Sequence, residues 1–422
     1  MAINIALANE GHSGGVTVPG FRVLRISTAR LLVNLNFVWP FINASYFGDS
    51  TLETNFIPVF IAAMLVPEVL FEDSRSLILS GAIILLAAFA APPGSYAWLR
   101  LVIAVIPTIF LIGFYRYLSR SNRELISISL VELSLLGFLG LSIIQFVDFK
   151  LIRIIPDWFT RIMSGLVPRY MQSASDVRGV SGWASEPATA ALMCFAFATV
   201  LIQNEPRKRL RVFLLFGLLT FLNKSLYSLA LLTYLVLIQV AVMRRRVYAI
   251  VFLVVALFVG LYVVHSSARV AELEESFFTD LQFSETDSPQ LQRIAQIVFP
   301  LMSFPRIYEP IAIYADQSYI VQPLGLLPLL VGYGSLLGCF LYYRLIFRMM
   351  PPREANSKLL ALLGILVLSL WSPPNFVPSI IAFIYCLKPG THETRTVIEK
   401  RKGILPALLS IRPANFGQVP NA

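Results

Sequence analysis

The clearest candidate for chemistry in this sequence is a small, polar segment at 169–190, which reads RYMQSASDVRGVSGWASEPATA. It places a guanidinium, Arg178, a flexible glycine, Gly182, and a carboxylate, Glu186, within one turn-rich stretch. Pro187 suits the first position of a helix, so Glu186 would cap that helix at the positive end of its dipole. In a functional interpretation, Gly182 lets the backbone approach a ligand closely. In a structural interpretation, Glu186 only caps the helix, and Arg178 and Glu186 form an ion pair within the loop. Both interpretations stay open on this pattern alone.

Further cations fall where the chain leaves long apolar runs. Lys224 separates two such runs, Arg100 follows a Pro-Pro-Gly turn, and Arg293 lies in a later polar stretch. A single lysine or arginine at such a place often has no ligand. Its aliphatic part lies along the apolar surface, and its charged group reaches the water at the membrane surface. Several cations around one opening instead indicate an anionic ligand there.

The sequence lacks the motifs of metal and cofactor chemistry. It has no phosphate-binding glycine loop, no Gly-x-Ser-x-Gly motif and no histidine–acid cluster with metal-ligand spacing. The three histidines are scattered, and the three cysteines lie in apolar segments, as expected of small buried side chains. We expect no metal and no cofactor, so an enzyme here would need an already activated substrate.

Composition indicates that these residues belong to a membrane protein. Hydrophobic residues make up 57% of the 422-residue chain and charged residues only 14%, against about 25% in soluble proteins. Runs such as 76–91 and 247–264 approach or reach the roughly 17–25 residues of a membrane-spanning helix. The net charge of +10 does not indicate a nucleic-acid partner, because the basic residues gather in short turns between apolar runs.

The positive-inside rule then predicts a single all-α transmembrane domain over 1–422, with about twelve spans. Both termini would be cytoplasmic tails, 1–20 and 389–422, and the first tail lacks the basic start and apolar core of a cleavable signal. The predicted spans are 29–46, 55–71, 76–92, 98–117, 125–147, 186–203, 210–222, 225–242, 247–264, 326–348, 357–371 and 374–388.

This topology leaves two long loops on the side opposite the basic turns, at 148–185 and 265–325. Long loops in a compact protein are usually functional. Within them, 151–167 and 289–302 have apolar residues at helical spacing, which predicts interfacial helices lying on the membrane. We expect these loops to lie outside, opposite the basic turns, and to carry the chemistry.

Two carboxylates fall inside predicted spans, Glu132 and Glu68. A charge in a membrane helix is costly unless it faces the bundle or is protonated. A proton-coupled transporter would need such residues, but a structural hydrogen bond is the simpler expectation for each.

The segment 178–191, Arg-Gly-Val-Ser-Gly-Trp-Ala-Ser-Glu-Pro-Ala-Thr-Ala-Ala, resembles the Arg…Gly…Glu-Pro-Ser signature of bacterial O-antigen and exopolysaccharide repeat-unit polymerases. The chain departs from it by having Ala188-Thr189 where serine is usual, and by one extra residue between Arg178 and Gly182. Three weaker similarities follow in the order of that family. They are a Lys-Ser segment at 222–229, a Ser…Arg element at 287–293, and Ser318-Tyr319 before a glycine-rich stretch.

The resemblance implies a GT-C-like, metal-independent glycosyltransferase of the bacterial inner membrane. It would transfer a polyprenyl-diphosphate-linked glycan onto a hydroxyl of another lipid-linked repeat at the periplasmic face. Both lipid-linked glycans and membrane lipid would be its partners, with a chain-length-regulating co-polymerase as a further candidate and no nucleic acid.

The resemblance also implies roles for individual residues. Glu186 would orient or deprotonate the acceptor hydroxyl, with His265 as the reserve candidate. Gly182 and Tyr319 would line the site. The diphosphate would be neutralised by cations, drawn from Arg178, Lys224, Arg293, Arg169 and Arg100.

Two other functions fit the same architecture. An O-antigen ligase would move the finished glycan onto the lipid A core, but ligases usually have Asn before the proline where this chain has Glu186. A lipid-linked oligosaccharide flippase or another transporter should carry charges along a central cavity through both leaflets. The charges predicted here gather outside, which favours the polymerase.

Overall fold

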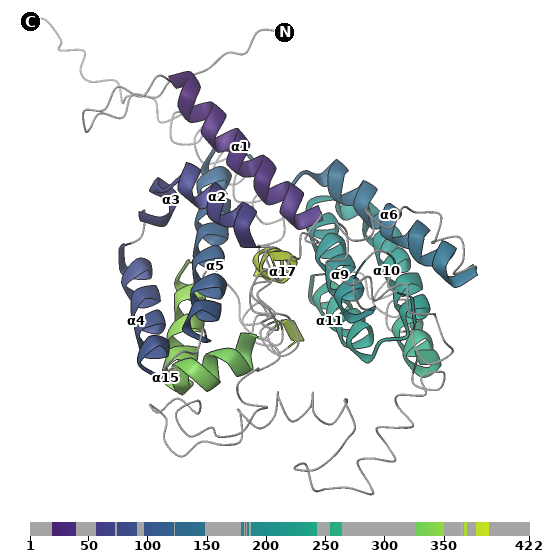
Figure 1. Cartoon of the computed structure of the whole chain (residues 1–422). Helices are drawn as coiled ribbons and strands as arrows, with labels where there is room; N and C mark the ends of the chain where they lie inside the picture. The colour runs from purple at the N-terminus through teal and green to yellow at the C-terminus, as the bar shows by residue number, and fades with distance from the viewer. Residues whose placement is uncertain are drawn as a thin grey trace, which may run out of the picture.

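The computed structural model describes helices from both halves of the chain (Figure 1). The described residues are 19–38, 56–71, 74–90, 97–121, 123–147, 179–180, 182, 184, 187–242, 254–263, 326–349, 364, 367–368 and 377–387. Within these ranges every element of secondary structure is helical. The prediction of an all-helical protein is therefore confirmed for this part of the chain.

The helices follow the apolar runs of the sequence. They are α1 (Pro19–Val38), α2 (Ile57–Leu65), α3 (Glu68–Phe71), α4 (Ser74–Ala90), α5 (Ala97–Arg120), α6 (Ile128–Val147), α9 (Pro187–Asn204), η3 (Pro206–Lys208), α10 (Arg209–Asn223), α11 (Leu226–Val242), α15 (Leu326–Met349) and α17 (Val377–Leu387). A further helical stretch covers Val254–Val263. Most ends agree with the predicted spans to within a few residues.

Two predicted spans differ from the structure. The span expected from 29 begins at Pro19, because a proline suits the first turn of a helix and the following basic residues continue the helical pattern. The span expected over 55–71 is broken into α2 and α3 at Val66-Pro67. Proline cannot donate the backbone hydrogen bond that a continuous helix would need there.

Helix α9 is the centre of one group of helices. It packs against α6, α10, α11 and α17, and its side chains from Ala190 to Gln203 are buried all around the helix. Helix α5 is the centre of a second group, with α2, α3, α4 and α15 packed around it. Helix α17 contacts both central helices, and α1 crosses from α2 to α6 and α17 (Figure 1).

Three described helices are long and apolar enough to cross a membrane: Leu101–Arg120, Ile128–Val147 and Pro187–Asn204. At about 1.5 Å per residue, 18–20 residues match the roughly 30 Å of bilayer hydrocarbon. Helix α6 also turns large apolar side chains outward, among them Leu133 at 68% and Phe146 at 52% exposure. These features fit a membrane-embedded protein, while the count of twelve spans stays a prediction.

Charge divides the described helices into two ends. We call one the basic end: there α5 finishes, α6 begins, and η3 connects α9 to α10. Contacts across this end join the start of α1 to α5, α3 and the α5–α6 connection. Among residues with described side chains, it holds every arginine and every lysine except Lys224, namely Arg22, Arg25, Arg30, Arg75, Arg116, Arg120, Arg123, Arg207, Lys208, Arg209, Arg211, Arg344 and Arg348.

Both carboxylates predicted inside spans have basic partners at this end. Lys208 Nζ donates to Glu132 Oε2 at 2.7 Å, and Arg211 Nη1 lies 3.5 Å from Glu132 Oε1. Glu68 Oε1 lies 3.8 Å from Arg25 Nη2. A charge near hydrocarbon is stabilised by such pairing. The structural hydrogen bond expected of Glu132 is therefore present, whereas Glu68 has an ion pair in its place.

The Glu132–Lys208 pair predicts a charge-swap rescue. Glu132→Lys would put like charges beside Lys208 and Arg211, so we expect a lower thermal unfolding midpoint in detergent. Adding Lys208→Glu should recover part of that loss, since pairs this exposed are coupled by about 0.2–1 kcal/mol. Glu124→Lys, an exposed carboxylate nearby, serves as the control. Equal midpoints for the single and double variants would contradict a direct pair.

Candidate functional site

Of the predicted site residues, the structure describes Gly182 and Lys224 in full. Arg100 lies in α5, but its side chain is outside the described residues. Also outside them are Arg169, Arg178, Glu186, His265, Arg293 and Tyr319.

The described parts of 179–184, the α10–α11 turn and the last turns of α6 come together at the end of the helices opposite the basic end. We call this group the polar corner: Ser142, Gln145, Gly179, Val180, Gly182, Asn223 and Lys224.

Gly182 attaches its segment to α6. Its backbone N–H donates to Gln145 Oε1 at 2.9 Å. Its φ of +59° is a left-handed backbone conformation that residues other than glycine rarely adopt. A Cβ added here would lie 3.2 Å from Ser142 Oγ and 3.3 Å from Phe138 Cδ1. The fold therefore needs a glycine at this position. The contact of Gly182 with a glycan stays a prediction.

The other side of the segment lies on the turn between α10 and α11. Val180 N–H donates to the Leu222 carbonyl at 3.2 Å, and Asn223 Nδ2 donates back to the Val180 carbonyl at 3.1 Å. A Cβ on Gly179 would overlap the backbone of Asn223, so glycine is required for this close approach. Two stretches about forty residues apart in sequence are thus held together by paired hydrogen bonds.

Asn223 also fixes the start of α9. The same Nδ2 atom donates to the Pro187 carbonyl at 2.6 Å, and the side chain is 1% exposed. Asn223 therefore bridges the segment at 179–184 and the first residue of α9. Glu186 directly precedes that residue in the sequence. The N–H groups of a first helical turn have no helical partners, so they add positive potential beside this position.

Lys224 adds a cation to the same turn. It follows the last residue of α10 and has φ +51° and ψ +24°, with its N–H donating to the Thr220 carbonyl at 3.2 Å. Glycine or asparagine normally occupies such a left-handed helix end. Lys224 is the only non-glycine residue with positive φ in the described part of the chain. Backbone strain kept at one position is a reason to look for function there.

Two buried polar atoms of the polar corner have no hydrogen-bond partner within the described part of the chain: Ser142 Oγ and Asn223 Oδ1. Ser142 is fully buried, and Asn223 is nearly so. Leaving a buried polar atom unpaired costs about 1–3 kcal/mol. As far as the structure describes the corner, one hydroxyl and one amide oxygen are thus left unpaired beside the predicted site.

The sequence analysis gave no role to Ser142, Gln145 or Asn223. Ser142 and Gln145 lie three residues apart, with Phe138 one turn earlier, so one face of the second half of α6 carries both polar groups among apolar residues. Polar residues in a membrane helix usually face a neighbour or a cavity, which is the signal that could have identified them. Asn223 could have been suspected as a polar residue that ends an apolar run.

No group of three or more histidine, cysteine or acidic side chains that could hold a metal ion occurs among the described residues. The three cysteines are free; Cys194 and Cys339 are buried, and Cys386 is half-buried. The polar groups of the polar corner are the Asn223 and Gln145 amides, the Ser142 hydroxyl and the Lys224 ammonium group, beside the start of α9.

Comparisons with protein-family models, with curated proteins and with solved structures gave no match to this chain. The fold and the polar corner define the class: an all-helical, membrane-embedded protein with a polar, glycine-dependent site at one end of its helices. A more specific function must be argued from the residues.

The geometry at Gly182 predicts a selective loss of stability. Gly182→Ala would place a Cβ in a left-handed conformation and against Phe138, at a cost of about 1–2 kcal/mol or more. We expect a lower thermal unfolding midpoint. Gly140→Ala is the matched control, because a Cβ added to Gly140 of α6 would have nothing within 4 Å. That control should leave the midpoint unchanged or raise it. A harmless Gly182→Ala would refute the tight contact with α6.

Lys224 predicts the opposite effect. Lys224→Gly removes the left-handed strain, offset in part by the larger chain entropy of glycine, so a gain of roughly 0.5–1 kcal/mol is expected. The thermal midpoint of purified protein measures it, with Lys224→Ala, which keeps the strain but loses the charge, as the control. A midpoint for Lys224→Gly no higher than that of Lys224→Ala would show that the backbone is unstrained.

Proposed function

We propose that this protein is a metal-independent, GT-C-like glycosyltransferase that polymerises polyprenyl-diphosphate-linked repeat units into O-antigen or exopolysaccharide. One observation carries the proposal. The two stretches whose order resembles the polymerase family, the segment before Glu186 and the segment around Lys224, are hydrogen-bonded to each other through Val180 and Asn223. If both segments belong to one site, they must lie together in the fold, as these two do at the polar corner.

In the proposed reaction, a hydroxyl oxygen of the acceptor glycan attacks the anomeric carbon of the donor glycan. The bond between that carbon and the diphosphate oxygen breaks, and polyprenyl diphosphate leaves with the electron pair. Glu186 orients the hydroxyl and accepts its proton. Because the activated donor supplies the driving force, no metal or cofactor is needed for this step.

Charge stabilisation of the leaving diphosphate is assigned to Lys224 and Arg178, with Arg293, Arg169 and Arg100 as additional cations. Charge-assisted hydrogen bonds to a phosphate are stronger than neutral ones, above all where hydrocarbon excludes water. Lys224 follows Asn223, which binds the start of α9, so its charge and the helix terminus both belong to the polar corner. His265 and Tyr319 remain proposed glycan contacts.

The proposed orientation puts the basic end in the cytoplasm and the polar corner at the periplasmic face of the inner membrane. The grouping of basic side chains at one end of the described helices supports it, because cytoplasmic ends carry the excess of lysine and arginine. Both tails and the two long loops keep their predicted sides in this proposal. The polyprenyl chains would lie against the apolar helix faces.

Deletion of the gene in its own host tests this function. Lipid-linked and surface glycans are extracted and sized by gel and mass spectrometry, and we expect glycan capped at one repeat. Full-length glycan left on its polyprenyl carrier would make the protein a ligase. Repeats trapped at the cytoplasmic face would make it a transporter. Either result would overturn the polymerase.

Complementation of the deletion strain then tests the site. Glu186→Gln should reduce polymer by on the order of a hundredfold or more, as loss of a general base does. Lys224→Gly should also lose polymer although it is expected to be stable, and Lys224→Arg should retain part of it. Gly140→Ala, in a region of α6 without close contacts, serves as the control. Full polymer from both Glu186→Gln and Lys224→Gly at normal expression would refute the assignment.

A further inference from the structure

A cavity at the basic end lies away from the polar corner and has no part in the proposed reaction. It has a volume of about 140 Å³ and lies between α3, α4, α5 and α15. That volume is well above the roughly 10–15 Å³ that one water needs. The cavity can therefore hold a polyatomic group.

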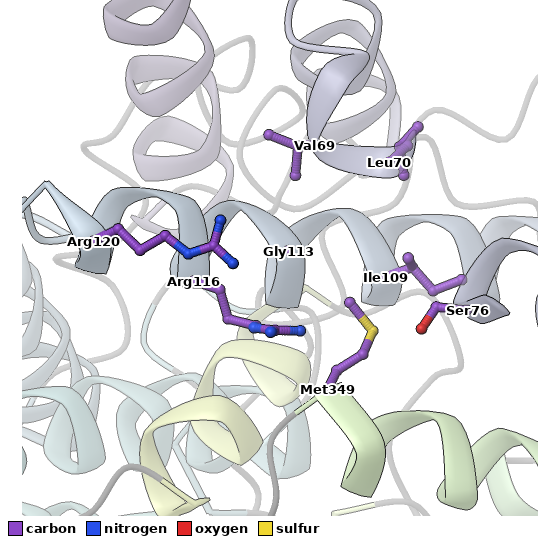
Figure 2. A pocket seen from close by; sticks show the side chains of 8 residues that line it. All are labelled: Val69, Leu70, Ser76, Ile109, Gly113, Arg116, Arg120 and Met349. Atoms are coloured by element: carbon purple, nitrogen blue, oxygen red, sulfur yellow. The ribbon is translucent and has the colours of Figure 1, made fainter. Parts of the chain in front are cut away.

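Two arginines of α5 line this cavity, Arg116 and Arg120. They are four residues apart, so they lie on the same face of the helix one turn from each other. Figure 2 shows Arg116 extending along α5 towards Met349, with Val69 and Leu70 above the helix in this view. None of the described residues that line the cavity is a carboxylate.

The remaining walls are mostly apolar. Val69 and Leu70 come from α3, Ile109 from α5 and Met349 from the end of α15, and the hydroxyl residue Ser76 of α4 completes the lining. A site with two guanidinium groups against apolar walls matches an anion that carries a hydrocarbon portion. Free phosphate would gain nothing from the apolar part.

The position within the helices points to the membrane surface. Arg116 and Arg120 lie in the last two turns of Leu101–Arg120, one of the three helices able to cross a bilayer. Arginines at such a helix end reach the level of lipid headgroups. Basic pockets between membrane helices bind anionic headgroups there. Arginine also suits phosphate, because its planar fork can donate two hydrogen bonds at once.

We propose that this cavity binds the phosphate group of an anionic phospholipid, with Arg116 and Arg120 on the phosphate and the α3, α5 and α15 side chains on the glycerol and acyl portion. The close fit of α3 on α5 shapes the site. A Cβ on Gly113 would meet Val69 Cγ1 at 2.9 Å and the Val69 carbonyl oxygen at 3.2 Å, so glycine lets the two helices approach here. This binding does not depend on the proposed glycosyl transfer.

The test measures thermal stabilisation of the purified full-length protein in detergent. Phosphatidylglycerol and cardiolipin should raise the unfolding midpoint, and native mass spectrometry should show bound lipid. Phosphatidylcholine and inorganic phosphate, added separately, should have little effect. The double variant Arg116→Gln/Arg120→Gln should weaken lipid binding on the order of tenfold or more.

The matched control is Arg123→Gln/Arg207→Gln, which removes the same charge from exposed positions at the basic end outside the cavity lining. It should bind the anionic lipids as the natural protein does. Equal losses in both double variants would mean diffuse surface attraction and overturn the site. So would equal stabilisation by inorganic phosphate, or the absence of any lipid effect on the natural protein. If the cavity variant does not fold, Arg116→Lys/Arg120→Lys keeps the charge and should show an intermediate loss.

Discussion

The rest of the described structure depends on the burial of helix α9, whose side chains from Ala190 to Gln203 are covered on all sides by α6, α10, α11 and α17. Polar contacts attach the neighbouring segments at its two ends. At one end Asn223 donates to the Pro187 carbonyl, and at the other Lys208, in the connection after α9, pairs with Glu132 of α6. Since Gln145 of the same α6 binds Gly182, α6 is attached near both ends of α9. The two points of attachment on α6 lie about 20 Å apart along its axis, at 1.5 Å for each residue from Glu132 to Gln145.

This arrangement separates two kinds of positive charge. The basic end has many arginines and lysines, and its charge is partly neutralised by ion pairs with Glu132 and Glu68. At the polar corner, by contrast, Lys224 is the cation with a described side chain, and it adjoins a helix terminus and two unpaired polar atoms. An anion bound there would meet a preorganised site, because hydrogen bonds hold the loop and the turn in place before any ligand arrives.

Sequence reasoning located most helices because an apolar run of suitable length in a membrane has few alternatives to a helix. It went wrong where one residue decided the outcome: Pro67 breaks a span into α2 and α3, and Pro19 starts α1 earlier than the apolar pattern does. It named Gly182, a glycine in the polar segment before Glu186, and Lys224, a charged residue between two apolar runs. It gave no role to Ser142, Gln145 and Asn223, because their importance comes from contacts between helices that the sequence does not order. Contact between the 179–184 segment and the α10–α11 turn likewise needed the fold, since about forty residues separate them.

Lys224 gives the most direct argument that the corner binds an anion. A left-handed lysine costs about 1–2 kcal/mol relative to an ordinary conformation, and glycine would avoid most of that cost while ending α10 equally well. The hydrogen bond to Thr220 uses only the backbone N–H, so the lysine side chain is not needed to end the helix. What glycine could not supply is a positive charge beside Asn223 and the start of α9. A polymerase, a ligase and a transporter of lipid-linked glycans would all meet a diphosphate, so the charge fits each of them. The proton transfer proposed for Glu186 would belong to glycosyl transfer alone, so a test of this residue separates the enzymes from the transporter.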